Sequence, residues 1–369
     1  MVAIGAWLPL LGMPARGWLD FSAFYAAGAL AFGPQVVDLV AIATYQAAHG
    51  LPNTPFLYPP GLALAYVPFT WLPYDLAGGI HVALQSAALI AAAMLGSRVY
   101  GICLRWAVLG TLAWAPAAAG VVSGQNTGVI VLLTVVTTWG LARGSDGIAG
   151  LAIGLAAYRP QVGAALAALA LWRGVWRAVA VSAAVVVGHY ALGVIATGGS
   201  LDWPAQWLAT VRTETANDFR SVGWQALGLP GIFGQISVGG SAPGALLGPS
   251  VIGYIIGFVV IASALKSLRV WDAQRAVALT CALALFAGPR GFTYDAALLL
   301  PALAVLVRDA AAREWPWQYR WLLAAAYGIA FLWPLGGILR VNPLALVVLA
   351  APFVLLGRGP FRIFRYAPI

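Results

Sequence analysis

Long apolar segments recur along the whole chain and are separated by short polar turns. Runs of about 18 or more apolar residues are typical of transmembrane helices. The apolar segments lie at 1–14, 77–97, 105–122, 127–142, 147–157, 161–172, 176–197, 246–265, 274–288, 294–308, 320–336 and 343–357. The pattern predicts an all-α, polytopic transmembrane protein with about 10–12 membrane segments.

Two neighbouring segments, 147–157 and 161–172, are too short to cross a membrane alone as straight helices. Either they are half-length helices that meet at Arg159-Pro160, or they form one span kinked by the proline. The first segment, 1–14, is also short, and it lacks the basic region and small-residue cleavage site of a signal peptide.

Two long connections, 15–76 and 198–245, interrupt the apolar pattern. Both are rich in Gly, Pro and aromatic residues, and neither carries the charge of a disordered linker. We therefore expect short helices lying along the membrane surface in both. No internal repeat and no separate soluble domain is visible, so 1–369 is predicted to be a single membrane domain.

Composition supports the membrane assignment. Hydrophobic residues make up 62% of the chain, charged residues only 8%, and the mean hydropathy is +0.88. A soluble fold needs more charged residues on its surface. The net charge of +9 does not indicate nucleic acid, because basic residues of such proteins mark cytoplasmic loops. Cys103 and Cys281 form neither a disulfide framework nor a metal-binding pattern.

The basic residues define an orientation. With the N-terminus in the cytoplasm, the cytoplasmic side holds 14 of the 20 basic residues: Arg98, Arg105, Arg143, Arg173, Arg177, Lys266, Arg269, Arg275, Arg308, Arg313, Arg320, Arg358, Arg362 and Arg365. The unusual polar stretches then all fall outside, at 19–25, 56–61, 123–128, 157–163 and 288–297. Their shared level predicts one extracytoplasmic site that is built from several loops.

The polar residues of these stretches define the chemistry that is available. They include carboxylates, guanidiniums, amides and phenols: Asp20, Asp295, Arg159, Arg290, Gln125, Asn126, Gln161, Tyr25, Tyr58 and Tyr294. No zinc spacing, nucleotide-phosphate loop or GxSxG motif is present in the sequence. A carboxylate that accepts a hydroxyl proton and arginines that hold a leaving phosphate suit sugar transfer from a lipid phosphate.

Four motifs carry a resemblance to glycosyltransferase family 87. LDFSAFYAAG with Asp20, followed by YPP at 58–60 and PFTWLP at 68–73, resembles the first outer loop of that family. SGQNTG at 123–128 and RPQ at 159–161 resemble its Gly-Gln and basic-Pro-Gln motifs, in the same order. The resemblance covers roughly residues 17 to 300 and is weak in the last third.

The resemblance implies a GT-C fold with its active site at the extracytoplasmic surface of the inner membrane. It implies a polyprenyl-phosphate sugar as donor, typically mannose and in some relatives arabinose, with no nucleotide. The family's acidic residue of the first outer loop falls on Asp20, as catalytic base. Some members carry a histidine in the late outer loop, where this chain has RGFTYDA, so Arg290, Tyr294 or Asp295 takes its place here.

Each candidate residue also has a structural interpretation. Asp20 can be the N-cap of the helix that begins at Phe21, as well as the base. Arg159 either clamps a phosphate or satisfies the carbonyls freed at a broken helix. Gln161 braces that helix end or contacts substrate.

The amides Gln125 and Asn126 either form a tight turn or bind sugar hydroxyls. Tyr58 either shapes its loop or stacks on a sugar. Arg290 and Asp295 either pair with each other, or bind phosphate and orient the acceptor.

The sequence therefore predicts an inverting membrane glycosyltransferase that acts on a lipid or glycan acceptor, with Asp20 as base and no metal or other cofactor. Its partners are the lipid-linked sugar donor, the acceptor and membrane lipids. A transporter or flippase of a lipid-linked sugar is the alternative, although transporters usually place polar groups near the bilayer midplane and show related halves. A third possibility is an inactive family member that acts as an assembly partner.

Overall fold

The computed structural model describes residues 19–221, 223–237, 248–288, 291–314 and 316–357. Within these ranges the chain folds into helices joined by turns, and they contain no strand. The all-α, polytopic architecture predicted from the sequence is confirmed. The predicted segment 1–14 and the candidate residue Arg290 lie outside the described residues.

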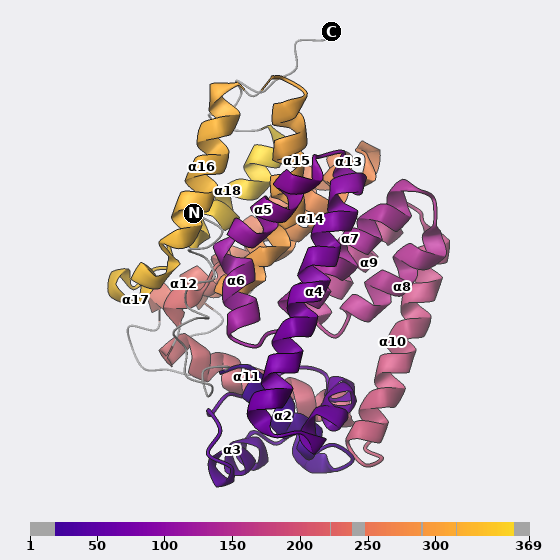
Figure 1. Ribbon diagram of the computed structural model, residues 1–369, viewed down its shortest axis with the longest axis vertical. Coiled ribbons are helices and arrows are strands. Elements are labelled where there is room, and N and C mark those ends of the chain that lie inside the picture. Colours follow the sequence, from indigo (N-terminus) through magenta and orange to yellow (C-terminus); the bar gives the residue numbers. More distant parts are fainter. Residues whose placement is uncertain (1–18, 222, 238–247, 289–290, 315, 358–369) are drawn as a thin grey trace.

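The apolar helices follow the predicted segments closely. They are α4 (Tyr74–Tyr100), α5 (Leu104–Ala113), α6 (Ala115–Val122), α7 (Thr127–Ala142), α8 (Asp146–Ala156), α9 (Pro160–Trp172), α10 (Trp176–Ala196), α13 (Gly248–Val270), α14 (Ala273–Phe286), α15 (Leu300–Ala311), α16 (Trp317–Phe331) and α18 (Leu344–Leu356). Figure 1 shows most of them packed side by side as one bundle.

Fewer of these helices are full-length spans than the number of apolar segments suggests. By length and composition, three described helices can cross a membrane alone: α4, α10 and the Ser250–Val270 part of α13. The count rises to five if the pairs bent by 62° at Trp114 and by 48° near Leu332 are each one span. Several other apolar helices have only 10–17 residues, below the roughly 20 that a straight crossing needs.

The region 147–172 forms two helices rather than one kinked span. A side chain at Gly150 would approach Ala178, and one at Gly154 would approach Ser182 and Val185, so α8 and α10 run in the same direction. The intervening α9 therefore carries the chain back, and Pro160 occupies its first position, where a proline is tolerated. The turn between α8 and α9 places Arg159 at the N-terminus of α9.

Glycine allows α4 and α7 to approach closely. A Cβ atom at Gly128 would lie 2.0 Å from the main-chain oxygen of Gln85. The same pair of helices is joined by a hydrogen bond of 3.1 Å from the Val129 amide to the Gln85 side-chain oxygen. The close approach brings the turn before α7, which carries Gln125 and Asn126, against the N-terminal half of α4.

We expect Gly128→Ala to destabilise the protein by about 1–3 kcal/mol, because the new methyl group must push two main chains apart. Gly188→Ala in α10 is the matched control, since nothing lies within 4 Å of a Cβ atom there. Thermal unfolding of the two purified variants in one detergent tests the prediction. Equal midpoints for both would show that the α4–α7 contact does not need glycine.

A layer built mainly of short helices lies at one end of the bundle, where Figure 1 shows α2, α3 and α11 together. The elements other than the apolar helices are, in the described chain, α2 (Phe21–Ala29), η1 (Pro34–Val37), α3 (Leu39–Ala48), η2 (Pro60–Trp71), α11 (Trp203–Ser221), η3 (Gly223–Gln225), α12 (Leu229–Ser237), η5 (Thr293–Leu299), η6 (Trp333–Leu335) and α17 (Gly336–Leu339). Short helices were predicted in both long connections, and both contain them.

The two long connections contact each other. The Trp207 indole donates to the Leu57 carbonyl at 3.2 Å, and the Thr210 hydroxyl donates to the Val37 carbonyl at 2.9 Å. The first connection has its own apolar core, in which the rings of Phe24 and Tyr66 stack at 4.8 Å. The layer is thus a packed structure that can hold the segment around Asp20 against the bundle.

An ion pair joins α14 to the C-terminal end of α15, which is the end away from η5. Arg275 of α14 pairs with Asp309 of α15, and both side chains are partly exposed.

Candidate functional site

Asp20 stands directly before α2 and is fixed to the turn that precedes α7. Its amide donates to the Ser123 carbonyl at 2.8 Å. The next residue of that turn, Gly124, has φ +83°, and a Cβ atom there would lie 2.6 Å from Phe21 Cβ. Two motifs that are a hundred residues apart in sequence are therefore in direct contact.

The Asp20 carboxylate does not cap α2. The residue has helical backbone angles (φ −78°, ψ −24°), and its side chain accepts no hydrogen bond from the first turn. A typical N-cap residue has extended angles instead, as Asp38 does before α3, where its carboxylate accepts from the Val40 amide at 2.8 Å. The capping interpretation of Asp20 is therefore not what the structure shows.

The surroundings of Asp20 make its carboxylate a stronger base than an exposed one. Removal from water raises the pKa of Asp20, and the nearby negative charge of Asp295 also raises it. Hydrogen bonding by the Ser123 and Gln125 side chains and the positive charge of Arg159 act in the opposite direction, but the pKa remains above its ordinary value. The residue is half-buried, so it keeps some accessible surface.

Arg159 is the centre of a buried polar cluster. It is 3% exposed and forms an ion pair with Asp295. Its second terminal nitrogen lies 3.4 Å from both the Tyr58 hydroxyl and the Gln125 side-chain oxygen. The rings of Tyr58 and Tyr294 lie 5.9 and 5.7 Å from the guanidinium carbon. Its partners in the described structure are thus side chains of other loops, not the carbonyls of a broken helix.

Asp295 belongs to the late loop and is held on two sides. One carboxylate oxygen pairs with Arg159, and the other accepts from the Phe292 amide at 2.9 Å. The proposed pairing with Arg290 lies outside the described residues. Asp295 is 8% exposed, so its charge depends on Arg159 for compensation.

The turn that carries Gln125 and Asn126 is tied to three other segments. The Tyr58 hydroxyl donates to the Gln125 side-chain oxygen at 2.5 Å. The Asn126 side-chain oxygen accepts from Tyr66 at 2.5 Å and from Gln85 at 3.2 Å. The Asn126 Nδ2 group is buried and has no hydrogen-bond partner within the described structure, so the cluster contains one unsatisfied amide donor.

Two of the candidates lie apart from the cluster. The Tyr25 hydroxyl donates to the Leu72 carbonyl at 2.9 Å and so joins α2 to the end of η2. Gln161 is exposed on the first turn of α9, and its side chain makes no hydrogen bond within the described structure. Its predicted bracing of the helix end is therefore not seen.

Sequence reasoning missed several residues that build the site. Tyr66 and Gln85 hold the Asn126 side chain, and the Tyr158 hydroxyl donates to the Asn126 carbonyl at 2.9 Å. His81 packs against Phe21 with ring centres 5.1 Å apart. The available signal was the polar Gln85 inside an apolar segment, where a polar side chain is costly without a role. The sequence also places His81 near the proposed site, at the start of a helix.

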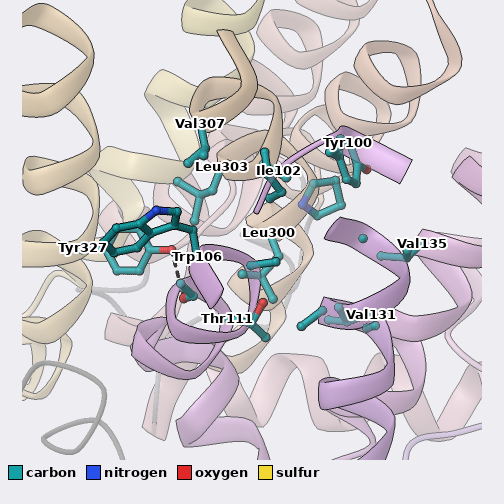
Figure 2. A pocket seen from close by; sticks show the side chains of 17 residues that line it. Tyr100, Ile102, Trp106, Thr111, Val131, Val135, Leu300, Leu303, Val307 and Tyr327 are labelled. Carbon is teal, nitrogen blue, oxygen red and sulfur yellow. Dashed lines mark hydrogen bonds between the residues drawn. The ribbon is translucent and has the colours of Figure 1, made fainter. Parts of the chain in front are cut away.

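An apolar cavity of about 70 Å³ lies elsewhere in the bundle, between α4, α5, α7, α15 and α16. Figure 2 shows Trp106 and Tyr327 on one side of it and Tyr100 on another. No candidate site residue lines this cavity. Among the described residues, no group of three His, Cys, Asp or Glu side chains could hold a metal ion.

Comparison with known proteins gives a family match. The model of glycosyltransferase family 87 matches residues 56–289, which is more than half of the chain. No match is found among curated proteins or among solved structures. The matched range includes the turn with Gln125 and Asn126 and the start of α9 with Arg159, but ends before Asp295 and begins after Asp20.

Proposed function

The chain belongs to glycosyltransferase family 87, and we propose that it transfers a sugar from a polyprenyl-phosphate donor to a lipid or glycan acceptor. We assign mannose as the sugar and the extracytoplasmic face of the inner membrane as the place of reaction. The observation that carries the proposal is the half-buried Asp20 carboxylate, which does not cap α2 and lies beside the Arg159 cluster. Within the described structure this carboxylate caps no helix and forms no ion pair, so it can accept a proton from a hydroxyl group.

The proposed reaction is a single displacement. The acceptor hydroxyl gives its proton to the Asp20 carboxylate while its oxygen bonds to the anomeric carbon of the sugar. The bond from that carbon to the phosphate oxygen breaks, and the electron pair leaves with the lipid phosphate. One displacement inverts the anomeric configuration. A phosphate is a good leaving group, so no second carboxyl acid is required, in contrast to glycosidases.

In this proposal, the positive charge of arginine side chains stabilises the departing phosphate. Arg159 supplies a buried guanidinium next to Asp20, and we assign the direct phosphate contacts to Arg159 and Arg290. The free Asn126 Nδ2 group and the Gln125 side chain suit sugar hydroxyls. The phenol rings of Tyr58 and Tyr294 suit stacking on the sugar. Tyr25 and Gln161 lie apart from the cluster and are left out of the proposed substrate-binding set, and Asp295 acts there through its ion pair with Arg159. No metal or other cofactor takes part in the proposed reaction.

Reconstitution distinguishes the transferase from a flippase of a lipid-linked sugar. Purified protein in proteoliposomes receives polyprenyl-phosphate mannose and a mixed lipid extract as acceptor. We expect mannosylated product together with free polyprenyl phosphate in equal amounts. Movement of intact donor across the bilayer without product would show that the protein is a flippase and not a transferase.

The acid side of the pH profile reports on the base. Asp20 must be unprotonated to act, so transfer is expected to fall as the pH is lowered. Because the pKa of Asp20 is raised, the midpoint of that fall is expected above the ordinary aspartate value of about 3.9. The measurement is kcat/KM against pH with the protein verified as folded at each pH. A midpoint at or below the ordinary value would argue against Asp20 as the base.

A further inference from the structure

The Arg159 guanidinium lies between the loop that carries Asp295 and the turn to which Asp20 is fixed. Arg159 forms its ion pair with Asp295, across 136 residues of sequence, and its other terminal nitrogen lies 3.4 Å from the Gln125 side-chain oxygen of that turn. The Asp20 amide donates to the Ser123 carbonyl of the same turn, and no ion pair between Arg159 and Asp20 is present in the described structure. Two carboxylates are thus held near one cation, and Asp295 is its ion-pair partner.

We infer that Asp295 is a positioning residue: by taking the Arg159 guanidinium as its ion-pair partner, it keeps the Asp20 carboxylate unpaired and available to the acceptor hydroxyl. Asp295 is itself fixed by the Phe292 amide, so it cannot follow Arg159 freely toward Asp20. The kinetic readout of this inference rests on the proposed function of Asp20 as base.

The geometry restricts Arg159 to this arrangement. Its guanidinium is enclosed by the Tyr58 and Tyr294 rings, and its second terminal nitrogen faces Tyr58 and Gln125. The Nε atom is buried without a partner, so one donor is available if the Asp295 pair is removed. Loss of Asp295 would leave Asp20 as the nearest anion to an uncompensated buried cation.

Other titratable groups surround the segment of Asp20 and the Arg159 guanidinium. Within the described residues, the rings of Tyr25, Tyr66, Tyr74 and His81 pack against Phe21, those of Tyr58 and Tyr294 lie near the Arg159 guanidinium, and Tyr158 packs against Tyr58. His81 is the group among them whose ordinary pKa lies near neutrality. The variants are therefore also made in a His81→Gln background, which removes that titration from the profile.

The two partners of the ion pair are expected to act on Asp20 in opposite directions. Asp295→Asn removes the competitor and a negative charge, so the acid midpoint of kcat/KM should fall by about one pH unit or more. Arg159→Gln removes the positive charge, so the midpoint should rise. Asp295→Glu keeps the charge and should restore a midpoint near that of the wild type.

A purely structural ion pair would behave differently, because both substitutions would weaken the fold and neither would shift the midpoint. Arg275→Gln and Asp309→Asn, in the ion pair at the far end of α15, are matched controls for that case. Infrared titration of the Asp20 carboxyl, with the Asp20→Asn spectrum subtracted, measures the same protonation without any turnover.

Opposite shifts for Asp295→Asn and Arg159→Gln, with no shift in the controls, would support the inference. Shifts in one direction, or an unmoved infrared midpoint in Asp295→Asn, would overturn it. If Asp295→Asn does not fold, Arg159→Gln is compared with the double variant Arg159→Gln/Asp295→Asn, whose midpoint should be the lower of the two. A wild type that transfers no sugar would refute the proposed function, while the infrared titration would still decide the inference.

Discussion

Asp20→Asn is expected to lower the rate of sugar transfer by about 10²–10⁴-fold, the usual contribution of a general base. Asparagine keeps the size of the side chain but cannot accept the acceptor proton. The fold should change little, because the Asp20 carboxylate caps no helix and the bond from its amide to Ser123 is retained. The measurement is kcat with saturating donor and acceptor, beside thermal unfolding of the same preparation.

Asp38 provides the matched control for this prediction. It is a carboxylate in the same layer of short helices, but it does cap a helix, α3. Asp38→Ala is therefore expected to cost about 1 kcal/mol of stability and to leave transfer unchanged. If Asp20→Asn kept wild-type transfer, Asp20 would not be the base, and Asp295 would be the next carboxylate to test.

Arg159→Met is expected to destabilise the protein by about 3–5 kcal/mol, because it leaves the Asp295 carboxylate buried without compensation. Met fills most of the space of the arginine stem, so lost packing contributes little. Unfolding of the purified variant in detergent, by heat or denaturant, measures the loss. The partly exposed pair of Arg275 and Asp309 should lose less when Arg275→Met is made.

The double variant Arg159→Met/Asp295→Leu separates charge burial from other causes. Replacing both members of a buried ion pair by apolar residues is often neutral or stabilising. We therefore expect the double variant to recover most of the stability that Arg159→Met loses, while transfer remains impaired. A double variant less stable than Arg159→Met would mean that the pair is not the source of the loss.

Much of the fold could be predicted from hydrophobic runs alone. The segment 127–142 coincides with α7, and 161–172 differs from α9 by one residue. Lengths of continuous apolar sequence and the proline after Arg159 decide these boundaries locally. Whether a helix spans a bilayer depends on bends such as the one at Trp114, which sequence periodicity does not reveal.

The sequence predicts which loops form the site, but it does not predict which side chains in those loops bond to one another. Five polar stretches were expected at one level, and the described structure brings residues from each of them together. The partner of Arg159 could not be found from sequence, because the pair with Asp295 depends on how α9 and η5 pack. For the same reason Tyr25 and Gln161 resembled site residues in sequence but lie apart from the cluster.

A comparison of donors with the purified wild-type protein tests most directly whether it transfers sugar from a lipid phosphate. Polyprenyl-phosphate mannose, a polyprenyl-phosphate pentose and a nucleotide-linked mannose are each offered with one lipid acceptor extract. We expect transfer from the polyprenyl-phosphate mannose, equimolar release of lipid phosphate, an inverted anomeric linkage, and no transfer from the nucleotide sugar. Transfer from the nucleotide sugar, or none from any lipid-phosphate donor, would contradict this expectation.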